Sequence, residues 1–520
     1  MNLFSYDKPR YTLNQPVRLF ESFSGIGTQA MALKRLGVEI EHVGVSEWQI
    51  DSIISYANVH HCDKLVETNY SREYLLKELA KHTFSKDGQK PVKKTYFDRW
   101  NVKDLNMFYQ CFVVSKNYGS ILDINGADLG EIDIFTWSFP CTDLSKAGKQ
   151  KGLDGTRSGL GYQVIRIIGE MEVKPKVLLM ENVPDLLSEK FKEGWREMYH
   201  EIEKMGYTNY VEVLNAKNYG VAQNRDRVFM VSILGDYSYT FPRWVKLEKR
   251  LKDYLEDEVD EKYYLSEKQL KWAFGNALND KLKDVYDRRK AIINKDPAYT
   301  VATKTDRRVG DANFICDDID NEITVGEFIE KQMPRVIANV NPSGNGMNGN
   351  VWAGDISPTL TTNKGEGIKI AIPKATKQGY ALAKDGDGVY INRPHQKRGV
   401  VQDGMIQTIK TSGDDLGVVV NKYSEYSAQK ILGNLVDKED VVGTITANAM
   451  QSFNHDNCHI FKENDLRIRK LTPLECWRLM GISDEDFYKA QKVCSNSQLY
   501  KQAGNAICVP VLENIFKEII

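Results

Sequence analysis

At 520 residues the chain exceeds the size that one hydrophobic core normally serves, so we expect two domains or one large domain with a long insertion. Hydrophobic residues make up 42% and charged residues 27%, as in ordinary globular proteins, and no run approaches the ~20 apolar residues that span a bilayer. The formal net charge of -1 excludes a strongly basic protein, so any nucleic-acid contact must use a local basic face.

Three further features concern the chain as a whole. Residues 1–16 are polar and carry no secretory signal, so we expect a cytoplasmic protein. The eight cysteines are scattered, without a C-x-x-C pair, which favours reduced thiols and no structural metal. Basic runs at 90–94, 392–398 and 466–470 are candidate DNA contacts, although such runs are more often solvated surface.

Residues 17–235 alternate short apolar runs with amphipathic stretches. This pattern predicts an α/β fold, a doubly wound and mostly parallel Rossmann-like sheet with helices on both faces. The predicted strands are 18–20, 43–46, 132–136, 177–180, 211–214 and 228–233. A helix is predicted from Thr28 to Leu36, with Gly37 as its stop.

Two stretches interrupt this alternation. Residues 60–118 are long and charged for a connection in such a fold, so we expect an inserted helical element. Residues 241–465 are rich in glycine, asparagine and threonine, which predicts a second, β-rich domain, with 466–520 returning to the first domain of residues 1–240. Threonine-rich strands recur there at 299–303, 358–362, 407–411 and 443–447. They reflect either the β preference of threonine or equivalent loops that face one ligand.

A glycine turn, Phe23-Ser24-Gly25-Ile26-Gly27, follows the first predicted strand. Such turns let a ligand approach the backbone, but they are common in α/β proteins. The second strand is followed by Glu47 and Trp48, which suit ribose hydroxyls and an adenine ring. Ala30 replaces the third glycine of G-x-G-x-x-G, which disfavours a dinucleotide and favours a nucleoside without pyrophosphate.

Cys141 follows Phe139-Pro140 at the end of the third strand. A lone cysteine there is more often a buried filler, but the polar, glycine-rich sequence after it predicts a mobile loop and a nucleophile. A thiol of pKa ~8.5 is mostly protonated at pH 7, which costs about 2 kcal/mol unless cations help. Arg225 and Arg227 are our candidates for those cations.

Glu181 ends the fourth strand, among Leu178, Leu179, Met180 and Val183. Apolar surroundings disfavour the carboxylate anion, so Glu181 is a candidate proton donor to a ring nitrogen. The competing interpretation is an ordinary salt bridge at the end of a strand.

Seven motifs, in this order, resemble the cytosine-5 DNA methyltransferase family, over residues 1–235 and 466–520. They are Phe23-x-Gly25-x-Gly27, Glu47-Trp48, Phe139-Pro140-Cys141, Glu181-Asn182-Val183, Gln223-x-Arg225-x-Arg227, the run from Arg469 to Gly481, and Tyr500-Lys501-Gln502-x-Gly504-Asn505-Ala506. Because one such motif carries little information, the resemblance depends on their shared order.

The resemblance implies a DNA (cytosine-5-)-methyltransferase that uses S-adenosylmethionine and no metal. The residues it implies at the cofactor are Phe23, Gly25, Gly27, Glu47, Trp48, Ile121, Phe139 and Asn505. It implies that Cys141 attacks C6 of a flipped-out cytosine, that Glu181 hydrogen-bonds N3 and the exocyclic amine, and that Arg227 contacts O2. Arg225 would hold a phosphate or order the site. Pro140, Asn182 and Gln223 would lie at the substrate or DNA.

For partners, the resemblance implies double-stranded DNA, no membrane and a monomer, with a companion restriction endonuclease as a candidate. The role would be restriction-modification or protection of phage or host DNA. Residues 241–465 would form the target-recognition domain and read base edges in the major groove.

The sequence departs from the family pattern at three places, one of which is Glu21, where aspartate is common. Thr142 follows the Pro-Cys pair where glutamine is usual, and Ser120 replaces an expected acidic residue, with Asp123 as its substitute. Three alternatives stay open: a tRNA cytosine-5 methyltransferase, a catalytically silent DNA-binding relative, and a nicotinamide-dependent oxidoreductase, which the missing third glycine disfavours.

Overall fold

The structure, a computed structural model, describes residues 8–139, 159–265, 336–339, 351–354, 369–375, 380–391, 393, 396–411, 416–421 and 466–520. The chain divides into two compact units. The first consists of Met1–Lys249, Thr408–Ser412 and Pro473–Ile520, and the second of Arg250–Gln407 and Gly413–Thr472. The predicted domain boundaries, after residues 240 and 465, fall a few residues before the boundaries of these units at Lys249 and Thr472. The sequence did not predict that Thr408–Ser412 belongs to the first unit.

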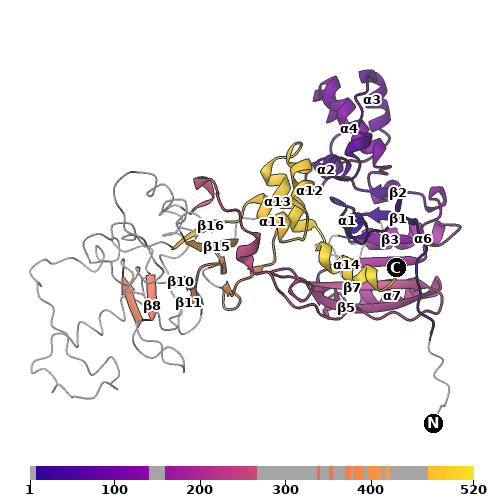
Figure 1. Cartoon of the computed structure of the whole chain (residues 1–520). Helices are drawn as coiled ribbons and strands as arrows, with labels where there is room; N and C mark the ends of the chain where they lie inside the picture. The colour runs from indigo at the N-terminus through magenta and orange to yellow at the C-terminus, as the bar shows by residue number, and fades with distance from the viewer. Residues whose placement is uncertain are drawn as a thin grey trace, which may run out of the picture. The chain divides into compact units, whose positions relative to one another are not determined.

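The first unit is built on a six-stranded sheet (Figure 1). Its strands are β1 (Val17–Ser22), β2 (Ile40–Ser46), β3 (Ile134–Trp137), β4 (Val177–Asn182), β5 (Tyr207–Asn215) and β7 (Asp226–Leu234), in the order β2-β1-β3-β4-β7-β5. The first four are parallel neighbours, whereas β7 runs antiparallel to both β4 and β5. The prediction of a mostly parallel Rossmann-like sheet is confirmed.

Helices connect and follow these strands. They are α1 (Thr28–Arg35), α2 (Ile50–His60), α3 (Arg72–Leu79), α4 (Val102–Val114), α6 (Leu160–Glu170), α7 (Lys192–Lys204), α11 (Pro473–Arg478), α12 (Asp484–Gln491), α13 (Asn496–Asn505) and α14 (Val509–Lys517). As predicted, the first helix stops at Gly37, whose φ of 74° lies in the left-handed region.

Both faces of the sheet are buried. Phe20, Phe135 and Met180 share one core with Ile168 of α6 and Ile202 of α7. Because side chains alternate along a strand, the neighbouring buried residues point to the opposite face. Elsewhere in the first unit, α1 packs against α14. Strands β3 and β4 are buried along their whole length, as expected for a sheet covered on both faces.

The predicted insertion between β2 and β3 contains α3 and α4, drawn at the top of Figure 1 beyond α2. It has a core of its own against α2, in which Phe84, Phe97 and Phe108 pack on Ile50 and Ile53. The insertion is therefore anchored to the helix that directly follows Glu47 and Trp48.

The second unit contributes short strands in the ranges that are described. One sheet has the order β11-β10-β8-β9 and the other β13-β12-β15-β16. The bounds are β8 (Val336–Asn339), β9 (Val351–Gly354), β10 (Lys369–Pro373), β11 (Tyr380–Ala383), β12 (Gly388–Tyr390), β13 (Val401–Gln402), β14 (Ile406–Gln407), β15 (Leu416–Asn421) and β16 (Leu466–Lys470). Arg469, in a basic run that was a candidate DNA contact, is only 2% exposed, so this side chain does not lie on the surface. The threonine-rich runs at 299–303, 358–362 and 443–447 lie outside the described residues.

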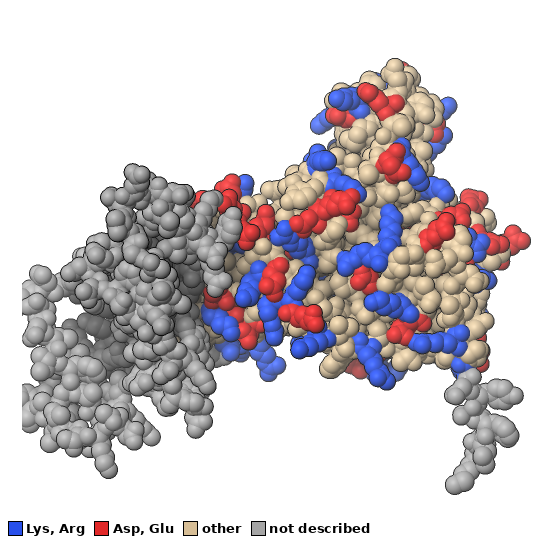
Figure 2. All heavy atoms as spheres, in the orientation of Figure 1, with Lys and Arg blue, Asp and Glu red and all other residues tan. Residues whose placement is uncertain are grey.

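Charge on the described surface is mixed. Figure 2 shows basic and acidic side chains interspersed over the visible face, in keeping with the net charge of -1. Among the described residues, no helix is long and apolar enough to cross a membrane, and no group of three or more His, Cys, Asp or Glu side chains could hold a metal ion.

Candidate active site

The glycine turn connects β1 to α1 with an unusual backbone. Phe23, Gly25 and Gly27 all have positive φ, of 54°, 55° and 75°. At Gly27 a side chain would collide with His60 and Tyr56, so only glycine fits. At Gly25, by contrast, a Cβ would meet no atom within 4 Å among the described residues. The turn therefore presents open backbone on one side, where a ligand can approach.

Glu47 holds this turn in place. Its carboxylate accepts the backbone N–H of Gly25 at 3.0 Å and that of Gln49 at 2.7 Å. Burial raises the pKa of Glu47, and these N–H groups oppose the increase. Each oxygen keeps a second lone pair, which suits a ribose hydroxyl.

The surroundings of this turn fit an adenosine group. Trp48 is half-buried, and the buried Ser24 hydroxyl has no hydrogen-bond partner in the described part of the chain. An aromatic face, an anionic acceptor and an open glycine backbone are therefore close together. The residues fit the nucleoside part of S-adenosylmethionine.

The loop after α4 contributes less directly than the sequence suggested. Ile121 is buried in the main core, with Phe139, and Ser120 caps the short turn Ile121–Asp123 by accepting the Leu122 N–H at 3.3 Å. The carboxylate of Asp123 accepts the Thr83 N–H from the insertion at 3.0 Å. Asp123, our expected substitute acid, is therefore already bound to another segment.

The chain is held just before the predicted nucleophile. Phe139 is buried, and its ring stacks on Trp137 with the centroids 5.5 Å apart. Its carbonyl accepts the side-chain N–H of Asn182 at 3.0 Å. Pro140 and Cys141 lie outside the described residues. The last described residue before them is thus tied to the residue after Glu181.

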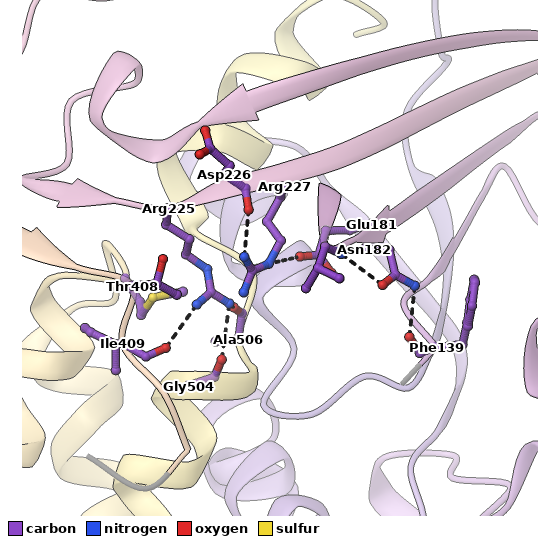
Figure 3. A network of polar contacts seen from close by, with 12 residues as sticks. Phe139, Glu181, Asn182, Arg225, Asp226, Arg227, Thr408, Ile409, Gly504 and Ala506 are labelled. Atoms are coloured by element: carbon purple, nitrogen blue, oxygen red, sulfur yellow. Dashed lines mark hydrogen bonds and ion pairs between the residues drawn. The ribbon is translucent and has the colours of Figure 1, made fainter. Parts of the chain in front are cut away.

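Glu181, which is buried, and Arg227, which is half-buried, form an ion pair at the ends of neighbouring strands (Figure 3). Arg227 Nε lies 2.9 Å from Glu181 Oε1, and one terminal nitrogen of Arg227 donates to the Asp226 carbonyl at 2.7 Å. Burial raises the pKa of Glu181, while the positive charges of Arg227 and Arg225 lower it. Glu181 therefore combines both interpretations: burial raises the pKa of its carboxyl, and the same carboxyl forms an ion pair with Arg227.

Arg225 is a structural residue in this arrangement. It is 3% exposed, and its guanidinium donates to the carbonyls of Ile409, Gly504 and Ala506 at 3.2, 3.2 and 2.9 Å. Burial, followed by repulsion from Arg227, lowers the pKa of Arg225 to about 9. Of the two roles expected for Arg225, these contacts support ordering of the site, and the contact with a phosphate stays a prediction.

Two residues expected at the substrate or DNA are buried inside the first unit. Gln223 is fully buried, donates to the Leu479 carbonyl at 2.9 Å and accepts the Ile409 N–H at 3.4 Å. Asn182 is 4% exposed, and its amide is occupied by Phe139 and Val183. Both side chains are bonded to backbone groups of the protein, and their contact with the substrate or DNA stays a prediction. Asn505, expected at the cofactor, is exposed at the end of α13.

Sequence reasoning missed the supporting residues that come from distant segments. Thr408 donates its hydroxyl to the Asn224 carbonyl at 2.9 Å. One of the recurring threonine runs therefore supports the backbone next to Arg225. Ser85 exchanges backbone hydrogen bonds with the Trp48–Ile50 segment. The Ser-Lys-Asp-Gly sequence at 85–88 is typical of a turn and was the available signal for the second of these contacts.

The fold and the candidate site are typical of α/β enzymes, in which ligands bind at the carboxyl ends of parallel strands. A sequence model of the family described as C-5 cytosine-specific DNA methylase matches residues 74–520. The chain belongs to this family, and it is a DNA (cytosine-5-)-methyltransferase. Membership implies the use of S-adenosylmethionine.

Individual relatives are similar over most of their length. The chain is 29% identical to the orphan methyltransferase M.SPRI of Bacillus phage SPR, covering 97% of both chains. It is 27% identical to the type II methyltransferase M2.ScrFI of Lactococcus lactis subsp. cremoris, covering 97% of this chain and 99% of the relative. It is 38% identical to the orphan methyltransferase M.SssI of Spiroplasma monobiae over 48% of this chain and 67% of the relative.

Proposed function

We propose that the protein methylates C5 of a flipped-out cytosine within a specific duplex DNA sequence, through a transient covalent bond between Cys141 and C6 of the base. The observation that carries this proposal is the largely buried Glu181–Arg227 pair next to the strand end that leads to Cys141. An acid and a cation are thereby available for one side of a pyrimidine ring, and a thiol for its C6 atom.

The chemistry requires both ends of this arrangement. C5 of cytosine is a poor nucleophile until a thiolate adds to C6 and converts the ring to an enamine. Adding a proton or a hydrogen bond at N3 draws the electrons of that addition away from C6, which is the role of Glu181. Loss of the C5 proton and departure of the thiolate restore the aromatic ring after methylation.

The environment of Glu181 suits this role. The residue is 8% exposed, and burial raises the pKa of its carboxyl, which increases the fraction that can donate a proton at N3. Arg227 opposes this effect while it pairs with Glu181. Once Arg227 turns to O2 of the cytosine, it stabilises the negative charge that develops on the ring. Asn182 and Arg225 hold the surrounding backbone.

S-adenosylmethionine, when bound, supplies an electrophilic methyl group on a sulfonium. Phe23, Gly25 and Trp48 would surround its adenosine, and Glu47 would accept hydrogen bonds from its ribose hydroxyls. Glu47 already fixes the Gly25 N–H, so the same carboxylate that shapes the turn would bind the nucleoside. This double use keeps the methyl donor in one place while the base enters and leaves.

For recognition, we assign the choice of DNA sequence to the second unit. Relatives named as orphan and as type II methyltransferases support two biological roles, protection of DNA without a partner enzyme and modification alongside a restriction endonuclease. We propose a monomeric enzyme, because Glu181, Arg225 and Arg227 are held by contacts within one unit of the chain. Enzymatic-conversion sequencing of DNA from cells that express the protein would identify the modified sequence.

The direct test is methyl transfer from labelled S-adenosylmethionine to duplex DNA and to tRNA in parallel. We expect label in DNA, at 5-methylcytosine, and background label in tRNA. Transfer to tRNA alone would replace the proposal by the tRNA methyltransferase alternative. Absence of transfer to either, with intact cofactor binding, would favour the catalytically silent relative.

A further inference from the structure

The insertion between β2 and β3 reaches the proposed cofactor site through one short segment, residues 83–90, which we call the bridging turn. It is anchored by Phe84, which is buried in the insertion core against Ile50 and Ile53. Anchoring of this kind fixes the turn relative to α2, the helix that follows Trp48. The bridging turn is therefore not a free surface loop.

Ser85 joins the bridging turn to the segment that carries Trp48. Its N–H donates to the Trp48 carbonyl at 2.7 Å, and its carbonyl accepts the Ile50 N–H at 2.9 Å. These two bonds enclose Gln49 on both sides, as in a short parallel bridge. The backbone at Trp48 can therefore not shift unless the bridging turn moves with it.

The same turn contacts two other segments that the proposed function places around the adenosine. Thr83 donates its N–H to the Asp123 carboxylate at 3.0 Å, beside Ile121. Lys501, in helix α13 that ends at Asn505, donates its Nζ to the Asp87 carbonyl at 2.5 Å. Three segments that are far apart in the sequence thus meet at one eight-residue turn.

Asp87 gives the turn its shape. Its Oδ1 accepts the N–H groups of Gln89 at 2.7 Å and Lys90 at 3.0 Å, and lies 3.1 Å from the Ser85 hydroxyl. The Ser85 oxygen also accepts the Gly88 N–H at 2.9 Å and donates to the Lys90 carbonyl at 2.6 Å. The backbone N–H groups lower the pKa of Asp87 to about 2, so the acceptor is ionised at neutral pH. The Asp87 carboxylate is exposed to solvent and reaches none of the proposed cofactor residues itself.

We propose that the bridging turn is a positioning element for S-adenosylmethionine, in which Asp87 and Ser85 hold Trp48, the Asp123 loop and Lys501 in the conformation that binds the cofactor. This inference rests on the proposed function, since it takes the adenosine site as given there. A site that is already ordered loses less conformational entropy when its ligand binds, so the effect falls on cofactor affinity.

The experiment compares Asp87→Ala with Asp87→Asn and with a control, Asp98→Ala, which removes an exposed carboxylate from the same insertion. The probe is S-adenosylmethionine itself, titrated by calorimetry without DNA. Asp87→Ala should weaken binding about tenfold, since two backbone N–H groups lose their acceptor. Asp87→Asn keeps an acceptor oxygen and should bind S-adenosylmethionine nearly as tightly as the wild type. Asp98→Ala should bind it as tightly as the wild type.

Two further measurements separate positioning from loss of folding. In steady-state methylation, Asp87→Ala should raise the KM for S-adenosylmethionine far more than it lowers kcat. Hydrogen exchange should quicken at the Trp48–Ile50 amides, with the melting temperature of the whole protein little changed. Wild-type affinity in Asp87→Ala, or an equal loss in Asp98→Ala, would overturn the inference.

The result can be interpreted separately from the proposed function. If wild-type protein binds S-adenosylmethionine but does not methylate cytosine in DNA, the proposed reaction fails, while the comparison of Asp87 variants still decides the role of the turn. If methylation proceeds and Asp87→Ala binds cofactor normally, only the inference about the turn fails.

Discussion

Replacement of Arg225 by alanine tests whether this arginine orders the protein or binds DNA. The guanidinium is 3% exposed and donates to three backbone carbonyls, which belong to Ile409, Gly504 and Ala506. Its removal leaves these acceptors without a donor, at about 1 kcal/mol or more each. Burial of the charged guanidinium is itself unfavourable, as its pKa of about 9 shows. Removal of that charge therefore limits the total loss of stability. We therefore expect the free energy of unfolding to fall by about 3 kcal/mol.

The assay is urea unfolding followed by tryptophan fluorescence, with Arg196→Ala as the control, because Arg196 is an exposed arginine of α7. The control should change stability by less than about 0.5 kcal/mol. Arg225→Lys should not restore stability, since one ammonium cannot reach three carbonyls in the geometry of a planar guanidinium. The reasoning would be refuted if Arg225→Ala left unfolding unchanged and instead weakened DNA binding with a shallower salt dependence, the behaviour of a phosphate contact.

Three other predictions follow from the same structure. Glu181→Gln should lower kcat about a hundredfold or more, since it removes the proton donor, while the affinity for S-adenosylmethionine measured without DNA stays the same; comparable loss of cofactor affinity would contradict a role at the base. Glu21 is fully buried, accepts the Tyr56 hydroxyl at 2.6 Å, and has a pKa that burial raises to about 7. Between pH 4.5 and 7 the folded state then binds more protons than the unfolded state, so the free energy of unfolding falls by up to about 3 kcal/mol as the pH rises through this window. Glu21→Gln should remove this fall in denaturation curves measured across the window, and an unchanged pH profile would contradict the prediction. Exchange of the second unit, Arg250–Gln407 with Gly413–Thr472, for that of another family member should change the methylated sequence in bisulfite sequencing, whereas an unchanged sequence would reassign recognition to the first unit.

Much of the first unit could be predicted from local patterns. The six strands and the helix that stops at Gly37 appear where short apolar runs and a glycine predicted them. Period-2 and period-3.6 patterns are properties of a few neighbouring residues, so a sequence shows them directly. The antiparallel direction of β7 depends on how the chain returns to the sheet, and no local pattern carried that information.

The candidate site divides in the same way. The motifs identified Glu181, Arg227 and Glu47, whose positions follow from strand ends. They did not show that Gln223 and Arg225 are buried, because the partners of these side chains lie at Ile409, Leu479 and Gly504, hundreds of residues later. Burial of a polar side chain depends on tertiary contacts, and those contacts are invisible to a motif.

The covalent step can be tested with duplexes that carry 5-fluorocytosine at the methylated position, once sequencing has identified it. Fluorine at C5 cannot leave as a proton does, so the bond between Cys141 and C6 should persist after methyl transfer. We predict that wild-type protein, given S-adenosylmethionine, forms a complex with this DNA that survives a denaturing gel, and that Cys141→Ser forms none. Failure of the wild-type protein to be trapped, or equal trapping of Cys141→Ser, would contradict the proposed mechanism.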